Sequence, residues 1–175
     1  MLKALTAALA GIALSIQPAS ATPSNFNAHV ELANTIMNAG VSFYVNPESC
    51  ADRNALGWYA GKRRELVVCQ ENGTPGGEQV IWTEEDFDTL RHEAHHFAQD
   101  CIAGTNHDHR LGTTHNTPIK LARNVLGDAN AQRIVNAYLA NGANEQTLIL
   151  ELEAFAVAHL NDPYLQISLI RRYCG

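Results

Sequence analysis

The segment TEEDFDTLRHEAHHFAQDC, residues 83–101, joins a helix-start signal to an unusual density of histidine. Thr83 followed three residues later by Asp86 matches a helix-capping signal, and the acidic first turn suits the positive end of a helix dipole. We therefore expect a long helix that begins after Thr83. Its back face carries the apolar residues that would anchor it to a core, namely Phe87, Leu90, Ala94, Phe97, Ala98 and Cys101.

Within this helix, residues 92–96 contain the motif HExxH. Residues four apart lie one turn from each other on the same face of a helix, so His92 and His96 can offer two imidazoles to one cation. Glu93 lies beside them and could take a proton from a metal-bound water. The alternative is a solvated polar helix face. We favour a metal site, because the apolar back face lets the helix pack firmly while both histidines face outward from it.

A second candidate segment is ILELEAFAVAHL, residues 149–160, in which Glu151 and Glu153 interrupt an otherwise apolar helix. Burying an unpaired carboxylate is costly, so each glutamate needs a partner, and a cation is the natural one. The sequence leaves open which of the two would bind it. The other could hydrogen-bond a ligand histidine, or both could be surface residues whose stems cover apolar neighbours.

These two segments together resemble the HExxH zinc metallopeptidases, the zincins, and within them the gluzincins, whose third ligand is a glutamate on a later helix. The resemblance covers the two motifs and not the whole chain. It implies one bound zinc ion, with His92 and His96 as ligands and Glu93 as the general base. Gluzincin third ligands commonly have an alanine three residues later, which holds for both Glu151 and Glu153. By this resemblance we favour Glu151, with Glu153 close behind.

The order of predicted elements indicates an α+β fold, a mainly helical zincin-like domain with a small, mostly antiparallel sheet before the HExxH helix. Apolar periodicity and turn signals place a first helix over residues 26–38 and a strand over 41–45. A hairpin and one further short strand follow. The remaining predictions are strands over 55–60, 65–70 and 79–82, and helices over 118–126, 128–140, 144–160 and 162–173.

The first 21 residues have the features of a secretory signal peptide. Lys3 is followed by an apolar stretch that is too short to span a bilayer, and Ala19-Ser20-Ala21 resembles a cleavage site. We therefore expect a signal peptide over residues 1–21 and a single domain over 22–175, secreted or periplasmic, with no stable membrane anchor after cleavage. A retained membrane anchor is the alternative.

The chain has four cysteines, an even number in a chain that we expect to be exported to an oxidising compartment, so two disulfides are predicted. We favour a pair between Cys50 and Cys69, since the segment between them reads as a local hairpin. The other pair, Cys101 with Cys174, would tie the C-terminal tail to the core. A cysteine zinc site is the rival, but no tight CxxC spacing occurs.

The balance of charge limits the partners. With 12 basic and 18 acidic side chains, the formal net charge is −6, which would repel a phosphate backbone and argues against nucleic-acid binding. The function that we expect is a secreted, monomeric zinc-dependent hydrolase that acts on a peptide or protein substrate, with Glu93 as its base. The alternative is a non-catalytic, disulfide-stapled metal-binding or envelope-binding protein, which would not need Glu93.

Overall fold

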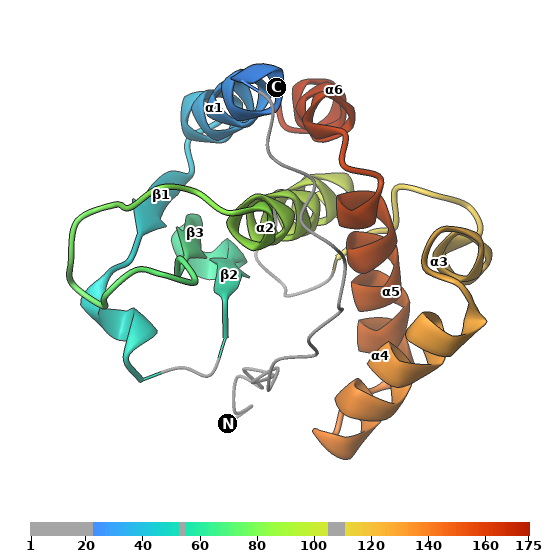
Figure 1. Ribbon diagram of the computed structural model, residues 1–175. Helices are drawn as coiled ribbons and strands as arrows, with labels where there is room; N and C mark the ends of the chain where they lie inside the picture. Colours follow the sequence, from blue (N-terminus) through green and yellow to red (C-terminus); the bar gives the residue numbers. More distant parts are fainter. Residues whose placement is uncertain (1–22, 53–54, 105–110) are drawn as a thin grey trace.

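The computed structural model describes residues 23–52, 55–104 and 111–175, so the predicted signal peptide over residues 1–21 lies outside the described residues. The predicted α+β class is confirmed (Figure 1). The helices are α1 (Pro23–Asn38), α2 (Glu84–Ile102), α3 (Pro118–Leu126), α4 (Asp128–Ala140), α5 (Glu145–His159) and α6 (Pro163–Tyr173). The strands are β1 (Ser42–Val45), β2 (Gly57–Ala60) and β3 (Glu65–Val68), and two short 3-10 helices span Glu48–Cys50 and Gly61–Arg63.

The sheet is mixed, not mostly antiparallel as predicted. The expected hairpin forms from β2 and β3, which pair antiparallel, but β1 pairs with β3 in parallel and the strand order is β1-β3-β2. The chain leaves β1, forms the far edge as β2, and returns between them as β3. Arg64 at this turn has a φ of 49°, and its guanidinium donates to Ala39 O and Gly40 O just before β1. These contacts hold the starts of β1 and β3 side by side.

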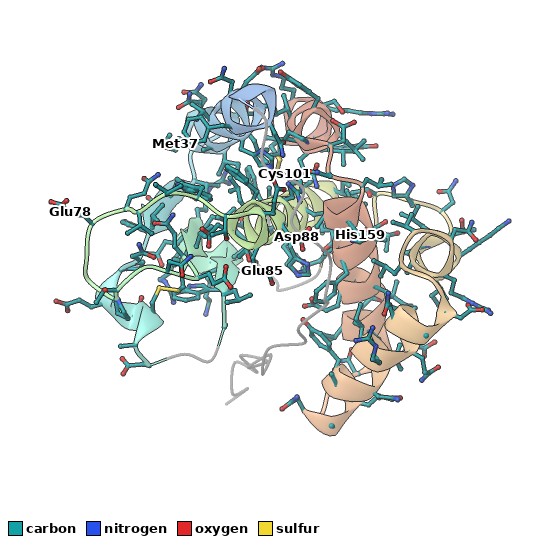
Figure 2. The ribbon with its side chains drawn as sticks, viewed as in Figure 1. Met37, Glu78, Glu85, Asp88, Cys101 and His159 are labelled. Carbon is teal, nitrogen blue, oxygen red and sulfur yellow. A yellow bond between two sulfur atoms is a disulfide. The ribbon has the colours of Figure 1, made fainter. Side chains whose placement is uncertain are left out.

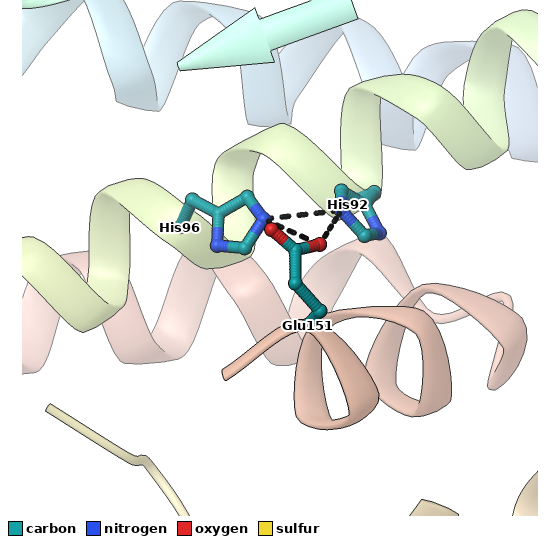
Figure 3. A group of neighbouring side chains, drawn as sticks. All are labelled: His92, His96 and Glu151. Atoms are coloured by element: carbon teal, nitrogen blue, oxygen red, sulfur yellow. Dashed lines mark hydrogen bonds and ion pairs between the residues drawn. The ribbon is translucent and has the colours of Figure 1, made fainter. Parts of the chain in front are cut away.

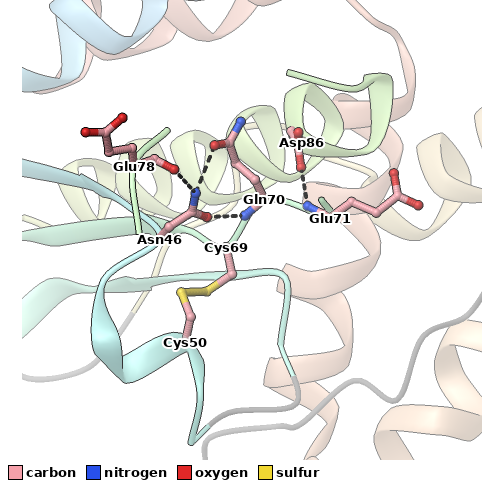
Figure 4. Close-up of a disulfide and its surroundings, with 7 residues drawn as sticks. All are labelled: Asn46, Cys50, Cys69, Gln70, Glu71, Glu78 and Asp86. Carbon is pink, nitrogen blue, oxygen red and sulfur yellow. Dashed lines mark hydrogen bonds between the residues drawn. A yellow bond between two sulfur atoms is a disulfide. The ribbon is translucent and has the colours of Figure 1, made fainter. Parts of the chain in front are cut away.

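The predicted strand over residues 79–82 was wrong, because side-chain amides take the place of a neighbouring strand. Val80 N–H donates to Gln70 Oε1 at 2.8 Å, and Gln70 Nε2 donates to Val80 O at 3.0 Å. Asn46 holds Gln70 in turn, since its Oδ1 accepts from Gln70 N–H at 2.7 Å and its Nδ2 donates to Gln70 Oε1 at 2.9 Å (Figure 4). The segment before α2 is therefore fixed without joining the sheet.

Both favoured disulfides are present, Cys50–Cys69 and Cys101–Cys174. The first joins the 3-10 helix after β1 to the end of β3 (Figure 4). The second connects the last turn of α2, where Cys101 is labelled in Figure 2, to the residue that follows α6. By closing loops of 19 and 73 residues, each should stabilise the fold by about 3 kcal/mol or somewhat more.

Helix α2 lies at the centre of the molecule, between the sheet on one side and α5 on the other, with α1 and α6 across its back (Figure 1). Its predicted cap is present: Asp86 N–H donates to Thr83 Oγ1 and Thr83 N–H donates to Asp86 Oδ2. The predicted apolar back face, apart from Phe87, packs into one core cluster with residues of α1, β3 and α6. This cluster contains Leu32, Ile36, Val41, Leu66, Val68, Leu90, Ala94, Phe97, Ala98, Cys101, Ile167 and Ile170.

A second core cluster joins α3 and α4 to the outer face of α5. It contains Ala122, Leu126, Ala131, Ile134, Tyr138, Leu152 and Ala156. Helix α5 thus packs against α2 with one face and against α3 and α4 with the other (Figure 1). This double packing determines which of its side chains point at α2.

A buried arginine next to the histidine motif links α1, α2 and α5. Arg91 is 3% exposed, and its Nε donates to Ala158 O at 2.9 Å. Its Nη1 donates to His29 Nε2 at 2.7 Å, while His29 Nδ1 donates to Asn25 O at 2.7 Å. His29 is therefore a neutral imidazole that accepts from a cation on one side and donates to a carbonyl on the other.

We predict that His29 makes the fold less stable in acid. Burial, together with the charge of Arg91, lowers the pKa of His29 from 6.5 to about 4. Between these two pH values the unfolded chain binds the proton more tightly, so the free energy of unfolding should fall with falling pH, by up to about 1.4 kcal/mol per pH unit. His29→Gln can still accept from Arg91 and should flatten this slope in urea unfolding. Parallel profiles for the wild type and the variant would contradict the prediction.

Candidate metal centre

Two imidazoles converge on adjacent turns of α2. His92 and His96 are 8% and 9% exposed, and their Nε2 atoms lie 3.1 Å apart (Figure 3). Two imidazole nitrogens this close can share one cation. The His92 ring also packs edge-on against Phe155 of α5, with the ring centroids 4.4 Å apart. Helix α2 therefore places His92 and His96 one turn apart on the same face, as predicted.

Glu151 of α5 completes the group. Its Oε2 lies 3.2 Å from His92 Nε2 and 3.4 Å from His96 Nε2 (Figure 3). The ligand atoms of these three residues all lie within 4.8 Å of one another, and they could hold a metal ion. The helices can approach here because small side chains, among them Ala154 and Ala158 of α5, are completely buried. Of the two glutamates left open by the sequence, Glu151 is the one that faces the imidazoles.

The charges of the site complement one another. Burial alone would raise the pKa of Glu151, but the facing imidazoles and their hydrogen bonds outweigh burial and hold this pKa well below its usual range. Burial alone would lower the pKa of His96, but the charge and hydrogen bond of Glu151 outweigh it and raise the pKa to about 9. Glu151 is therefore an ionised carboxylate that can offer its charge to a cation.

Tyr138 of α4 holds this carboxylate in place. Its hydroxyl donates to Glu151 Oε2 at 2.7 Å, and its side chain is 3% exposed. Burial, with the charge of Glu151 next in importance, raises the pKa of Tyr138, so it remains a donor. Sequence reasoning missed this residue. In the sequence Tyr138 is one more large residue on an amphipathic helix, and only the fold brings it to the site.

Glu93 lies beside the three-residue group and not within it. It is 8% exposed, and burial raises its pKa above the usual carboxyl range, although the charges of His92 and His96 oppose this. Strand β2 passes close over it. A Cβ at Gly57 would lie 2.6 Å from Thr89 Cγ2 and 3.3 Å from Glu93 Cγ. Only glycine allows this approach, so β2 and α2 enclose Glu93 and keep most solvent away from it.

Glu153 is surrounded by buried hydrogen-bond donors and lies apart from the metal group. It is completely buried, and its carboxylate accepts from Thr114 N–H at 3.1 Å, His115 N–H at 2.7 Å and Gln99 Nε2 at 2.8 Å. His95 Nε2 also lies 3.2 Å from it. Glu153 thus makes no direct contact with either histidine of the metal group, and the expected hydrogen bond to a ligand histidine is replaced by a contact through Gln99.

The arrangement could hold a cation beside a buried carboxyl group. When they bind a metal ion, two imidazoles and one carboxylate form a three-ligand set, any proton on the ligating nitrogens is released, and such a set leaves a position for water or substrate. A carboxyl group whose pKa is raised by burial accepts a proton more readily than an exposed one. Together these residues have the components of metal-assisted hydrolysis.

Comparison with known proteins identifies a family for this chain. A family model described as "Domain of unknown function (DUF8637)" matches residues 15–175. No curated protein and no solved structure matches the chain. The matched range contains every residue of the candidate metal centre.

Proposed function

Because the chain belongs to this family of unknown function, we propose its function from the site itself: a zinc-dependent hydrolase that cleaves peptide bonds. The observation that carries the proposal is the convergence of His92, His96 and Glu151 beside the buried carboxyl of Glu93. Two histidines and a glutamate form a ligand set that catalytic zinc sites use, and zinc accepts such a mixed nitrogen and oxygen set. The resemblance to gluzincins supports the same assignment.

Each residue then has a defined task. When bound, zinc would lower the pKa of a water to about 7 and polarise the scissile carbonyl. Glu93 takes the proton of that water and later passes it to the leaving amine, a role for which its raised pKa suits it. Tyr138 keeps Glu151 oriented toward the imidazoles. Strand β2 and the closely packed Gly57 limit the access of bulk water to Glu93.

The compartment is part of the proposal. Two disulfides hint at an oxidising environment. In the described part of the chain, none of the helices is both long and apolar enough to cross a membrane. We propose that residues 1–21 direct export and that the domain acts as a monomer on peptides or proteins outside the cytoplasm.

The direct test is metal-dependent hydrolysis. The purified chain, incubated with an unstructured protein substrate and analysed by mass spectrometry, should cleave peptide bonds with one equivalent of zinc. A chelator should remove the activity, and added zinc should restore it. Stoichiometric zinc uptake without any hydrolysis would favour the non-catalytic metal-binding alternative. Hydrolysis that persists in excess chelator would contradict the zinc mechanism.

A further inference from the structure

We infer that Gln99 is a positioning residue of the metal centre: it fixes a proton on His96 Nδ1 and so directs His96 Nε2 toward the metal. This inference rests on the proposed function, because it assigns a role toward the same ion. Gln99 lies one turn after His96 on α2, is completely buried, and belongs to neither the ligand set nor the general base. A chain of hydrogen bonds runs from Glu153 through Gln99 to His96.

Two acceptors fix the orientation of the Gln99 side-chain amide. Its Nε2 lies 3.1 Å from Leu150 O and 2.8 Å from Glu153 Oε2. A backbone carbonyl only accepts hydrogen bonds, and so does an ionised carboxylate. Both oxygens of Glu153 are placed as acceptors, since Oε1 accepts from His115 N–H and Oε2 accepts from Thr114 N–H. The NH₂ group of Gln99 must therefore face these two acceptors.

The orientation of Gln99 determines which ring nitrogen of His96 carries a hydrogen. With its nitrogen committed, Gln99 presents Oε1 to His96 Nδ1, at a distance of 2.8 Å. An amide oxygen cannot donate, so His96 Nδ1 must carry the hydrogen and donate it. The ring nitrogen left for a metal is then Nε2, the atom that lies 3.4 Å from Glu151 Oε2. The tautomer required for the proposed site is thus set by Gln99.

Contacts around Glu153 prevent the side-chain amide of Gln99 from flipping. Its partner Glu153 is held by the backbone N–H groups of Thr114 and His115 and by contact with His95. A flipped Gln99 would place its oxygen against Leu150 O and the Glu153 carboxylate, which would repel it. The segment after α2 and helix α5 therefore hold the direction of the hydrogen bonds that reach His96.

The two histidines differ in this respect. His92 Nδ1 is buried and has no hydrogen-bond partner among the described residues. Its ring is held by packing against Phe155 instead. A hydrogen bond to the second ring nitrogen both orients a ligand histidine and raises its basicity, and loss of such a partner typically weakens metal binding tenfold to a hundredfold. Loss of Gln99 should therefore weaken metal binding through its effect on His96 and not through His92.

The test reads the proton and the metal affinity separately. By NMR of ¹⁵N-labelled protein, with and without zinc, His96 Nδ1–H should give a proton signal that exchanges slowly with water. Gln99→Met should lose this signal and weaken zinc binding by about tenfold to a hundredfold, measured by competition with a chelating dye. Gln166→Met is the matched control, because Gln166 is also completely buried but donates to Arg91 O away from the ligands.

Two results would overturn the inference. One is a His96 protonated on Nε2 alone in the zinc-free protein or bound to zinc through Nδ1. The other is a Gln99→Met variant that binds zinc as tightly as Gln166→Met. A folded wild type that takes up no zinc would instead contradict the proposed function, while the zinc-free spectrum would still report the proton on Nδ1. If Gln99→Met fails to fold, the wild-type spectra alone decide.

Discussion

Replacing Glu93 by glutamine should abolish peptide hydrolysis and leave one zinc ion bound per chain. The amide has nearly the same shape as the carboxyl group but cannot accept the proton of the attacking water. Loss of a positioned general base lowers the rate by about a hundredfold to ten-thousandfold. The effect should fall on kcat, since Glu93 is outside the group of His92, His96 and Glu151 that could hold the ion. Zinc content by elemental analysis should match that of the wild type.

The control for this variant is Glu78→Gln. Glu78 is exposed on the loop before α2, with its side chain directed away from the molecule (Figure 2). The Glu78→Gln variant makes the same chemical change far from the site, and its peptidase activity should equal that of the wild type. If Glu93→Gln hydrolyses peptides at the wild-type rate, Glu93 is not the base. If the variant loses zinc as well, the separation between ligands and base is wrong.

The second large effect separates the two glutamates of α5. Glu151→Gln should reduce zinc affinity by more than about a hundredfold, because even the loss of a partner to a ligand costs tenfold to a hundredfold. Glu153→Gln should still take up one zinc ion at saturating concentration. It should instead lower the free energy of unfolding by about 3 kcal/mol, since it removes the charge that its buried donors bind. Dye competition and urea unfolding measure both quantities.

This pair of variants is its own control, because each makes the same chemical change two residues apart on one helix. The reverse pattern, in which Glu153→Gln loses zinc and Glu151→Gln keeps it, would mean that α5 is rotated relative to the structure. Equal zinc affinity in both variants would place the third ligand elsewhere.

Much of the region around α2 could be predicted from the sequence because its signals are local. The cap of Thr83 and Asp86 needs only a spacing of three residues, and the meeting of His92 with His96 needs only the helical repeat. The apolar back face follows from the same repeat. The Cys50–Cys69 disulfide follows from the local hairpin predicted between its two cysteines. Such features depend little on how distant parts of the chain pack.

The choice between Glu151 and Glu153 could not be made from the sequence in the same way. Two residues apart on a helix point in nearly opposite directions, and both glutamates have an alanine three residues later. The rotation of α5 about its axis decides which glutamate faces the imidazoles. This rotation is set by the packing of Leu152 and Ala156 against α3 and α4. Tyr138 reaches the site through this packing as well.

The errors in the sheet have a similar cause. A hairpin signal predicts the antiparallel pair of β2 and β3, but no local signal says on which side, or in which direction, β1 joins them. The segment over residues 79–82 resembles a strand in composition, yet the side chain of Gln70 binds its backbone. Long-range hydrogen bonds made by single polar side chains leave no periodic pattern to read.

The most direct test of the account is X-ray diffraction at the zinc absorption edge from crystals of the zinc-loaded protein. We predict one anomalous peak per chain, about 2.0–2.2 Å from His92 Nε2, His96 Nε2 and a carboxylate oxygen of Glu151. A peak bound by other side chains, or zinc-soaked crystals that show no peak at these three residues, would contradict it.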